Sequence, residues 1–216
     1  IFLVLGLTSV VRAEDRDSQA HVFPPELVVY GMTYGDWAAA FWQWDTSLPL
    51  SKNPAVTGTN CLIGQQNGPM FFAPVSLGGV VKVTCTIPDS KAIFLTVLTS
   101  ECSSIEGPPF NGSNPQELRQ CNGAVTDPLD PNTLTLTVNG TPIVSNLRRF
   151  RVQTPFFEFI MPPEDNLFKQ PGVTSAGSEL DGYFVILKPL RPGKYIIHFG
   201  GAFTSGPAAG FSADTT

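Results

Sequence analysis

Residues 92–98, Ala-Ile-Phe-Leu-Thr-Val-Leu, point most directly to the fold class, because they are apolar on both faces of an extended chain. A short apolar run rich in β-branched and aromatic side chains is typical of a buried strand. We therefore predict a central strand here. A similar run at 183–187 predicts another strand, and the turn at Arg191-Pro192-Gly193 leads from it into a further strand at 195–199.

The remaining strand signals lie on both sides of this central run. Residues 81–87 and 133–138 alternate apolar and polar side chains, which is the pattern of a half-buried strand. Asn139-Gly140 favours a two-residue hairpin turn, and two more strands are predicted at 150–152 and 156–160. Roughly eight strands without alternating helices favour a mostly-β fold, an antiparallel two-sheet β-sandwich of jelly-roll or immunoglobulin-like type with two short helices.

The first helix is predicted after Thr33, because Thr33 and Asp36 fit a capping box. Trp42 falls outside its apolar stripe, Asp45 is expected to be solvated, and Pro49 ends the helix. The residues of the stripe, which we expect to face the core, are Trp37, Ala40, Phe41, Trp44 and Leu48.

Four cysteines predict two disulfides. Cys61, Cys85, Cys102 and Cys121 are an even set without a CxxC pair, and the chain has only two His, which disfavours zinc. Of the three possible pairings we favour Cys61–Cys85 and Cys102–Cys121, because each closes a short loop. The second helix, predicted from Asn114 to a stop at Gly123, carries Cys121.

The N-terminus predicts export. Residues 1–13 read as the remnant of a signal peptide that ends on an acceptable cleavage site. Residues 14–29 are expected to form an extended arm, 30–201 a single β-sandwich domain and 202–216 a loose tail. No stretch reaches the roughly 18 apolar residues of a membrane-spanning helix. We therefore expect a secreted or extracytoplasmic protein with no transmembrane segment in its mature form.

The composition excludes some partners. The formal net charge is −5, which disfavours binding to nucleic acid, since such binding needs a basic face. Charged residues make up 14% of the chain, whereas 16 Phe and 3 Trp supply apolar surface for a core, so disorder is disfavoured as well.

Several motifs taken together resemble a group of uncharacterised exported microbial proteins of this size. The resemblance extends over residues 30–201 and implies export and the extent of the domain, but no activity. The motifs that carry it are Tyr34-Gly35-Asp36-Trp37 with Trp42-Gln43-Trp44, Asn60-Cys61, Asp181-Gly182-Tyr183, Pro192-Gly193-Lys194 and Ile197-His198-Phe199-Gly200-Gly201.

Aromatic residues are the first candidates for a ligand-binding surface. Trp42 lies off the core stripe, and Tyr30 and Tyr34 are close to it in sequence, so the three are expected to stack on a sugar or another apolar ligand. The alternative is that a second layer, such as the loop after Pro49, covers Trp42.

Carboxylates are the candidates for catalysis. Glu158 shares a strand face with Phe156 and Ile160, so its charge is expected either to mark a site or to pair with Arg149 or Arg151 on a neighbouring strand. Other acidic residues considered for a carboxylate-dependent hydrolase are Asp36, Asp45, Glu101, Asp165 and Asp181.

The two histidines raise a copper hypothesis. Cleavage after Ala20 would place His21 at the N-terminus, where it and His198 would supply imidazole ligands for copper. Cleavage after Ala13 is better placed and argues against this, so neither a metal nor a cofactor is predicted. His198 is otherwise expected to be a strand residue whose ring bonds a neighbouring loop.

Three classes of function follow. The favoured one is a non-catalytic exported module that binds a carbohydrate, an apolar ligand or a cell-surface partner. The alternatives are a carboxylate-dependent hydrolase or lyase acting on a polysaccharide, with Glu158, Arg151 and His198 as weak candidates, and a structural or self-assembling surface protein.

Overall fold

The computed structural model describes residues 21–216. The predicted signal peptide and residues 14–20 of the predicted arm lie outside the described residues. The part of the arm that is described, 21–29, is attached to the domain, since Val22 bridges Leu187 and the Phe23 amide donates to the Ile186 carbonyl at 2.9 Å. Within 21–216, no helix has the length and apolar character needed to cross a bilayer.

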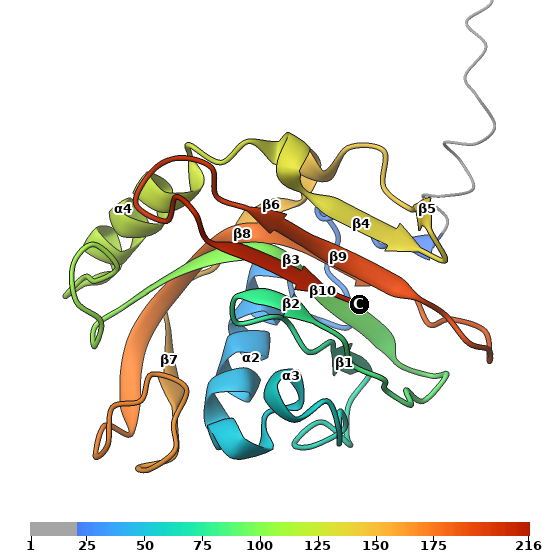
Figure 1. The fold of residues 1–216 in the computed structure, drawn as a ribbon, viewed down its shortest axis with the longest axis horizontal. Helices are drawn as coiled ribbons and strands as arrows, with labels where there is room; N and C mark the ends of the chain where they lie inside the picture. The colour runs from blue at the N-terminus through green and yellow to red at the C-terminus, as the bar shows by residue number, and fades with distance from the viewer. Residues whose placement is uncertain (1–20) are drawn as a thin grey trace, which may run out of the picture.

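The strands form two sheets, as expected for a mostly-β arrangement (Figure 1). In the first sheet the order is β1, β3, β8, β6, and β7 also pairs with β8. In the second sheet the order is β2, β10, β9, β4, β5. The bounds are β1 Met70–Phe72, β2 Gly79–Val81, β3 Ala92–Ser103, β4 Thr135–Val138, β5 Thr141–Pro142, β6 Arg151–Gln153, β7 Phe157–Ile160, β8 Ser175–Leu187, β9 Ile197–Ala202 and β10 Ser212–Thr215.

Both sheets are mixed, so the prediction of purely antiparallel sheets is wrong. β1 runs parallel to β3, and β2 runs parallel to β10. Parallel neighbours need a long connection between them. The chain meets this need by leaving the first sheet after β1, adding β2 to the second sheet and returning at β3, while β10 comes from the far end of the chain.

The helices begin where their capping residues predict. Thr33 and Asp36 form the predicted capping box of α2 (Tyr34–Ser47), and Asn114 caps α4 (Pro115–Thr126). The predicted stop at Gly123 is wrong, because the last turn of α4 packs its buried residues against the protein and its hydrogen bonds continue past the glycine. The shorter helical segments are η2 Leu50–Lys52, α3 Pro54–Thr57, η3 Pro131–Thr133 and η4 Leu147–Phe150.

The core centres on the long β3–β8 pair, with α2 in the hollow of the curved sheet (Figure 1). Phe41 of α2 stacks on Phe94 of β3 at 5.8 Å between ring centroids, and Phe94 stacks on Phe184 of β8 at 5.6 Å. The predicted core stripe of the helix is confirmed, with Ala40 half-buried at its edge and the other four residues buried.

A β-bulge in β3 re-aims the side chains that follow it. The pairing of β3 with β8 shifts between Thr96 and Leu98. Phe94 meets α2 before the bulge, whereas Ser100, after it, bonds Asn122 of α4 at 2.7 Å. The extra residue reverses the alternation of side chains between the two faces of the sheet. Phe94 and Ser100 therefore lie on opposite faces, which are covered by α2 and α4, and Glu101 points to the same side as Phe94 and Thr96.

Both predicted disulfides are confirmed. Cys61–Cys85 ties the loop after α3 to the extended segment after β2, and Cys102–Cys121 ties the end of β3 to α4. Two disulfides are consistent with an extracytoplasmic location.

Two predictions for extended segments need correction. The tail after residue 201 is not loose throughout, because β10 lies between β2 and β9. This docking requires Gly200, where a Cβ atom would collide with the Ala213 carbonyl oxygen. The strand predicted at 81–87 is shorter than expected, since only its first residue belongs to β2 and the remainder is extended without a ladder.

Candidate functional site

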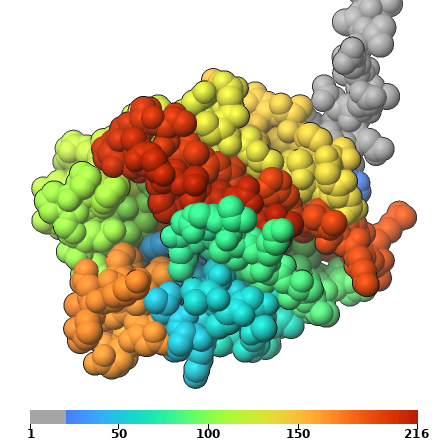
Figure 2. All heavy atoms as spheres, viewed as in Figure 1, coloured from blue at the N-terminus to red at the C-terminus, as the bar shows by residue number. Residues whose placement is uncertain are grey.

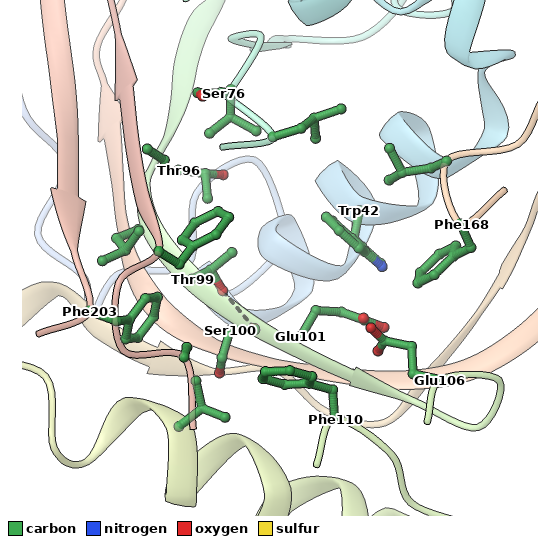
Figure 3. Close-up of a pocket in the computed structure, with 18 of the residues that line it drawn as sticks. Trp42, Ser76, Thr96, Thr99, Ser100, Glu101, Glu106, Phe110, Phe168 and Phe203 are labelled. Carbon is green, nitrogen blue, oxygen red and sulfur yellow. Dashed lines mark hydrogen bonds between the residues drawn. The ribbon is translucent and has the colours of Figure 1, made fainter. Parts of the chain in front are cut away.

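A cavity of about 620 Å³ lies between α2, the second half of β3 and the C-terminal segment (Figure 3). In Figure 2 the surface is hollowed where the orange, light-green and turquoise segments meet, and blue atoms of the N-terminal third lie at the bottom. Its walls come from several elements and loops. They are Phe41 and Trp42 of α2, Leu50 of η2, Val56 of α3, β3 between Thr96 and Glu101, Val125 of α4, Ala213 of β10, and loop residues at 75–77, 106–110, 167–169 and 203–211.

The cavity follows an open edge of β3. β1 pairs only with Ala92, Ile93 and Phe94, so on that side β3 has no neighbouring strand until Ser103 bridges Asn111. Side chains from α2 and from the loops line the space that a further strand would otherwise occupy. The cavity is therefore a product of the short β1.

Apolar side chains form most of the wall. Phe41, Leu98 and Phe203 are almost fully buried, so close packing fixes the conformation of this part of the wall. Phe168 meets Trp42 edge to face, with 6.4 Å between ring centroids, and closes one side. The cavity is therefore largely preformed, and its walls suit an apolar body.

Two carboxyl groups interrupt this apolar wall. Glu101 of β3 and Glu106 of the following loop direct their carboxyls toward each other (Figure 3). A hydrogen bond with Glu106 contributes to the raised pKa of Glu101. Ser178 donates to Glu101 Oε1 at 2.5 Å, and Ser103 donates to Glu106 Oε2 at 3.0 Å. Burial first, and then the neighbouring Glu106, raise the pKa of Glu101 well above its usual range. The protonated form of Glu101 is therefore favoured next to Glu106, with which it can share its proton.

Two further polar atoms of the cavity wall have no hydrogen-bond partner among the described residues. They are Nε1 of Trp42 and Oγ1 of Thr96, and both atoms are buried. Thr96 as a whole is only 1% exposed. Buried polar groups are normally paired, so unpaired groups on a cavity wall mark places where a ligand can supply the partner.

The predicted aromatic surface is only partly brought together. Trp42 lines the cavity and is half-buried. Tyr34 is 1% exposed, and its hydroxyl donates to the Phe23 carbonyl at 2.5 Å and accepts from the Ile186 amide at 3.1 Å, so it is a structural residue. Tyr30 is exposed in the turn before α2 and does not line the cavity.

The expected pairing of Glu158 with an arginine does not occur. Glu158 is exposed on β7, and Phe156 and Ile160 on the same face are exposed too, so this face points outward. Arg151 instead holds buried Asp181 at 2.6 Å and also Asp127. The reason is topological, since β6 and β7 both pair with β8 and not with each other.

His198 is engaged away from the cavity. Its Nε2 lies 2.8 Å from Asp214 Oδ2 on the adjacent strand β10, a strand partner in place of the predicted loop. His21 is exposed. Within residues 21–216, no three His, Cys, Asp or Glu side chains are grouped so that they could hold a metal.

Asp45 is buried, which overturns the expectation that it is solvated. It is 1% exposed, its Oδ1 accepts from Asn53 Nδ2 at 2.7 Å, and its Oδ2 has no partner among the described residues. Burial raises the pKa of Asp45 to about 6, although the bond from Asn53 opposes this. Asp45 does not line the cavity.

Of the polar residues in the cavity wall, only Trp42 and Glu101 are among the sequence-predicted candidates. Thr96 reads as part of an apolar strand, and Glu106 sits in a loop without any motif. No sequence signal joins them, because the bulge and the turn after β3 bring them together. No protein-family model, curated protein or solved structure matched this chain in the three comparisons.

Proposed function

We propose that this protein is an exported, non-catalytic binding module whose ligand is a small apolar molecule held in the cavity along β3. The observation that carries the proposal is a preformed cavity of about 620 Å³ with mostly apolar walls. This volume lies within the range of about 300–1,000 Å³ that is typical of small-molecule sites.

The cavity suits an apolar ligand better than a carbohydrate. A sugar presents hydroxyl groups all around its ring, and burying them without partners is costly. The cavity wall offers a few separated polar groups, namely Trp42 Nε1, Thr96 Oγ1 and the Glu101–Glu106 pair. A small number of polar groups on an apolar wall can orient an apolar ligand that carries a polar substituent.

The carboxyl pair favours one alternative, a carboxylate-dependent hydrolase. A carboxyl whose pKa is raised is a candidate general acid. However, glycosidases place their two carboxyls about 5 Å or more apart, across the bond that is cleaved. Glu101 and Glu106 are bonded to each other and leave no room for such a bond between them. Binding is therefore the function that the geometry favours.

The test is the binding of a neutral, environment-sensitive dye, N-phenyl-1-naphthylamine, to the intact disulfide-bonded protein. We expect one dye per chain. Ala208→Trp places a large side chain on the cavity wall and reduces the space for the dye. We expect it to weaken binding by about tenfold or more, which corresponds to about 1.4 kcal/mol of binding free energy. Ala209→Trp changes an exposed neighbour outside the cavity and serves as the matched control. Absent binding, or equal binding by both variants, would overturn the proposal.

A further inference from the structure

The Glu101–Glu106 pair places two facing carboxyl groups on the wall of an apolar cavity (Figure 3). Three charged or titratable side chains line the cavity within the described chain: Glu101, Glu106 and Lys169. Lys169 is exposed and follows Phe168 at the rim. Around the pair, β8 contributes the Ser178 hydroxyl and α2 contributes the uncharged Trp42. Among the described residues, no ion pair joins a cationic side chain to Glu101 or Glu106.

The hydroxyl partners of the two carboxyls are serine side chains. Ser178 binds Oε1 of Glu101, and Ser103 binds Oε2 of Glu106. Ser103 also bonds the Glu101 carboxyl, and the two carboxyl groups face each other across the wall of the cavity (Figure 3). A donor with several N–H groups that entered from the cavity could bond both carboxylates at once.

The cavity contains an independent sign that it is built for an occupant. Thr96 is 1% exposed, yet its hydroxyl has no partner among the described residues. Figure 3 shows the Thr96 hydroxyl on the cavity side of β3, well separated from the two carboxyls, with Trp42 across the space from it. A buried hydroxyl without a partner costs free energy until something supplies one. A ligand oxygen that reaches Thr96 would remove this cost.

We propose that the ligand is an apolar amine whose ammonium group binds Glu101 and Glu106 while its hydrocarbon body fills the cavity between α2 and the C-terminal segment. This rests on the proposed function. The ammonium group replaces the shared proton, which leaves to solvent, so that two carboxylates and one cation remain. The aromatic rings of Trp42 and Phe168 line the same space and are favourable neighbours for a cation. A fatty acid, in contrast, would bring a second negative charge to the pair.

The proton balance predicts how affinity depends on pH. Binding releases a proton wherever the free pair still holds one, so affinity for the amine rises with pH, by up to about tenfold per unit. The rise ends once pH passes the raised pKa of Glu101, because the free pair has then already lost the proton. A neutral ligand of the same shape causes no such release.

The experiment compares decylamine, decanol and decanoate by competition with the neutral dye and by calorimetry in two buffers of different ionisation enthalpy. At pH 7 we expect decylamine to bind about tenfold more tightly than decanol, because charged hydrogen bonds are the stronger kind, and decanoate to bind least. Of the three ligands, only decylamine should release protons when it binds.

Two variants and one control test the site itself. Glu106→Gln and Glu101→Gln are each expected to abolish the roughly tenfold preference for decylamine over decanol. Glu158→Gln removes an exposed carboxylate that does not line the cavity, and it should change the affinity for neither ligand. If decanol binds as tightly as decylamine, or if neither cavity variant weakens the amine, the inference is wrong. If no ligand binds at all, the proposed function itself fails.

Discussion

Asp45 allows a quantitative prediction about stability and pH. This carboxyl is almost fully buried near the end of α2, with one oxygen bonded to Asn53 and the other without a partner among the described residues. Burial raises its pKa from 3.8, the value expected in the unfolded chain, to about 6 in the folded protein. The folded protein therefore binds this proton more tightly than the unfolded chain does.

The sign and size of the effect follow from linkage. Below pH 4 both states hold the proton, and the contribution of Asp45 to stability is fully present. As pH rises from 3.8 to about 6, the unfolded chain releases the proton while the folded protein keeps it, so stability is lost, and the loss is complete once pH has passed the folded pKa. The interval from 3.8 to about 6 corresponds, at about 1.4 kcal/mol per pH unit, to about 3 kcal/mol lost by pH 7.5.

The perturbation is Asp45→Asn, which removes the charge and keeps the shape. We expect the variant to be more stable than the parent by about 1–3 kcal/mol at pH 7.5, since the introduced amide lacks an acceptor and offsets part of the gain. The difference should fall to zero or reverse near pH 4. Urea unfolding at several pH values between 4 and 7.5 measures it, and Glu158→Gln is the exposed control.

One result would refute this reasoning. If the difference in unfolding free energy between Asp45→Asn and the parent is the same at pH 4 and pH 7.5, Asp45 does not change its protonation between the two conditions. The buried carboxyl would then be charged and satisfied in the folded protein at both pH values, by contacts other than the bond from Asn53.

Two further predictions concern the core and the disulfides. Trp37 is buried and donates its indole N–H to the Val29 carbonyl at 2.8 Å, so Trp37→Ala should cost on the order of 3–5 kcal/mol in urea unfolding, and Trp37→Phe less; a near-neutral Trp37→Ala would mean that the core face of α2 is wrongly placed. Removing the Cys102–Cys121 bridge, which spans 19 residues, with the double variant Cys102→Ala/Cys121→Ala should cost about 3 kcal/mol and lower the melting temperature. Equal melting of the double variant and the parent would show that the bridge does not stabilise the fold.

Features that depend on neighbouring residues could be predicted from the sequence. The capping box of α2 joins residues three apart, and the Asn139-Gly140 turn joins adjacent strands β4 and β5. The disulfide pairing was predictable because each bridge closes a short loop. The helix face was predictable because a helix repeats its apolar positions at a fixed period.

Strand direction and the outward face of β7 were not predictable in the same way. An apolar strand reads alike in either direction, and the mixed sheets depend on where the chain crosses between layers. Phe156 and Ile160 look like core residues around Glu158, yet both are exposed, because the opposite face of β7 packs Phe157 and Phe159 inward.

The sequence by itself determined a mostly-β arrangement, the two main helices, the two disulfides and the mostly apolar character of the central strand, since each rests on local periodicity or short loops. Only the tertiary structure decided the cavity. Its walls join α2, β3, α4 and the C-terminal segment, which lie far apart in the chain. The short β1 opens the edge of β3, and the bulge turns Glu101 toward Glu106. The physical reason is that side-chain burial and charge depend on neighbours from distant segments, which no local pattern specifies.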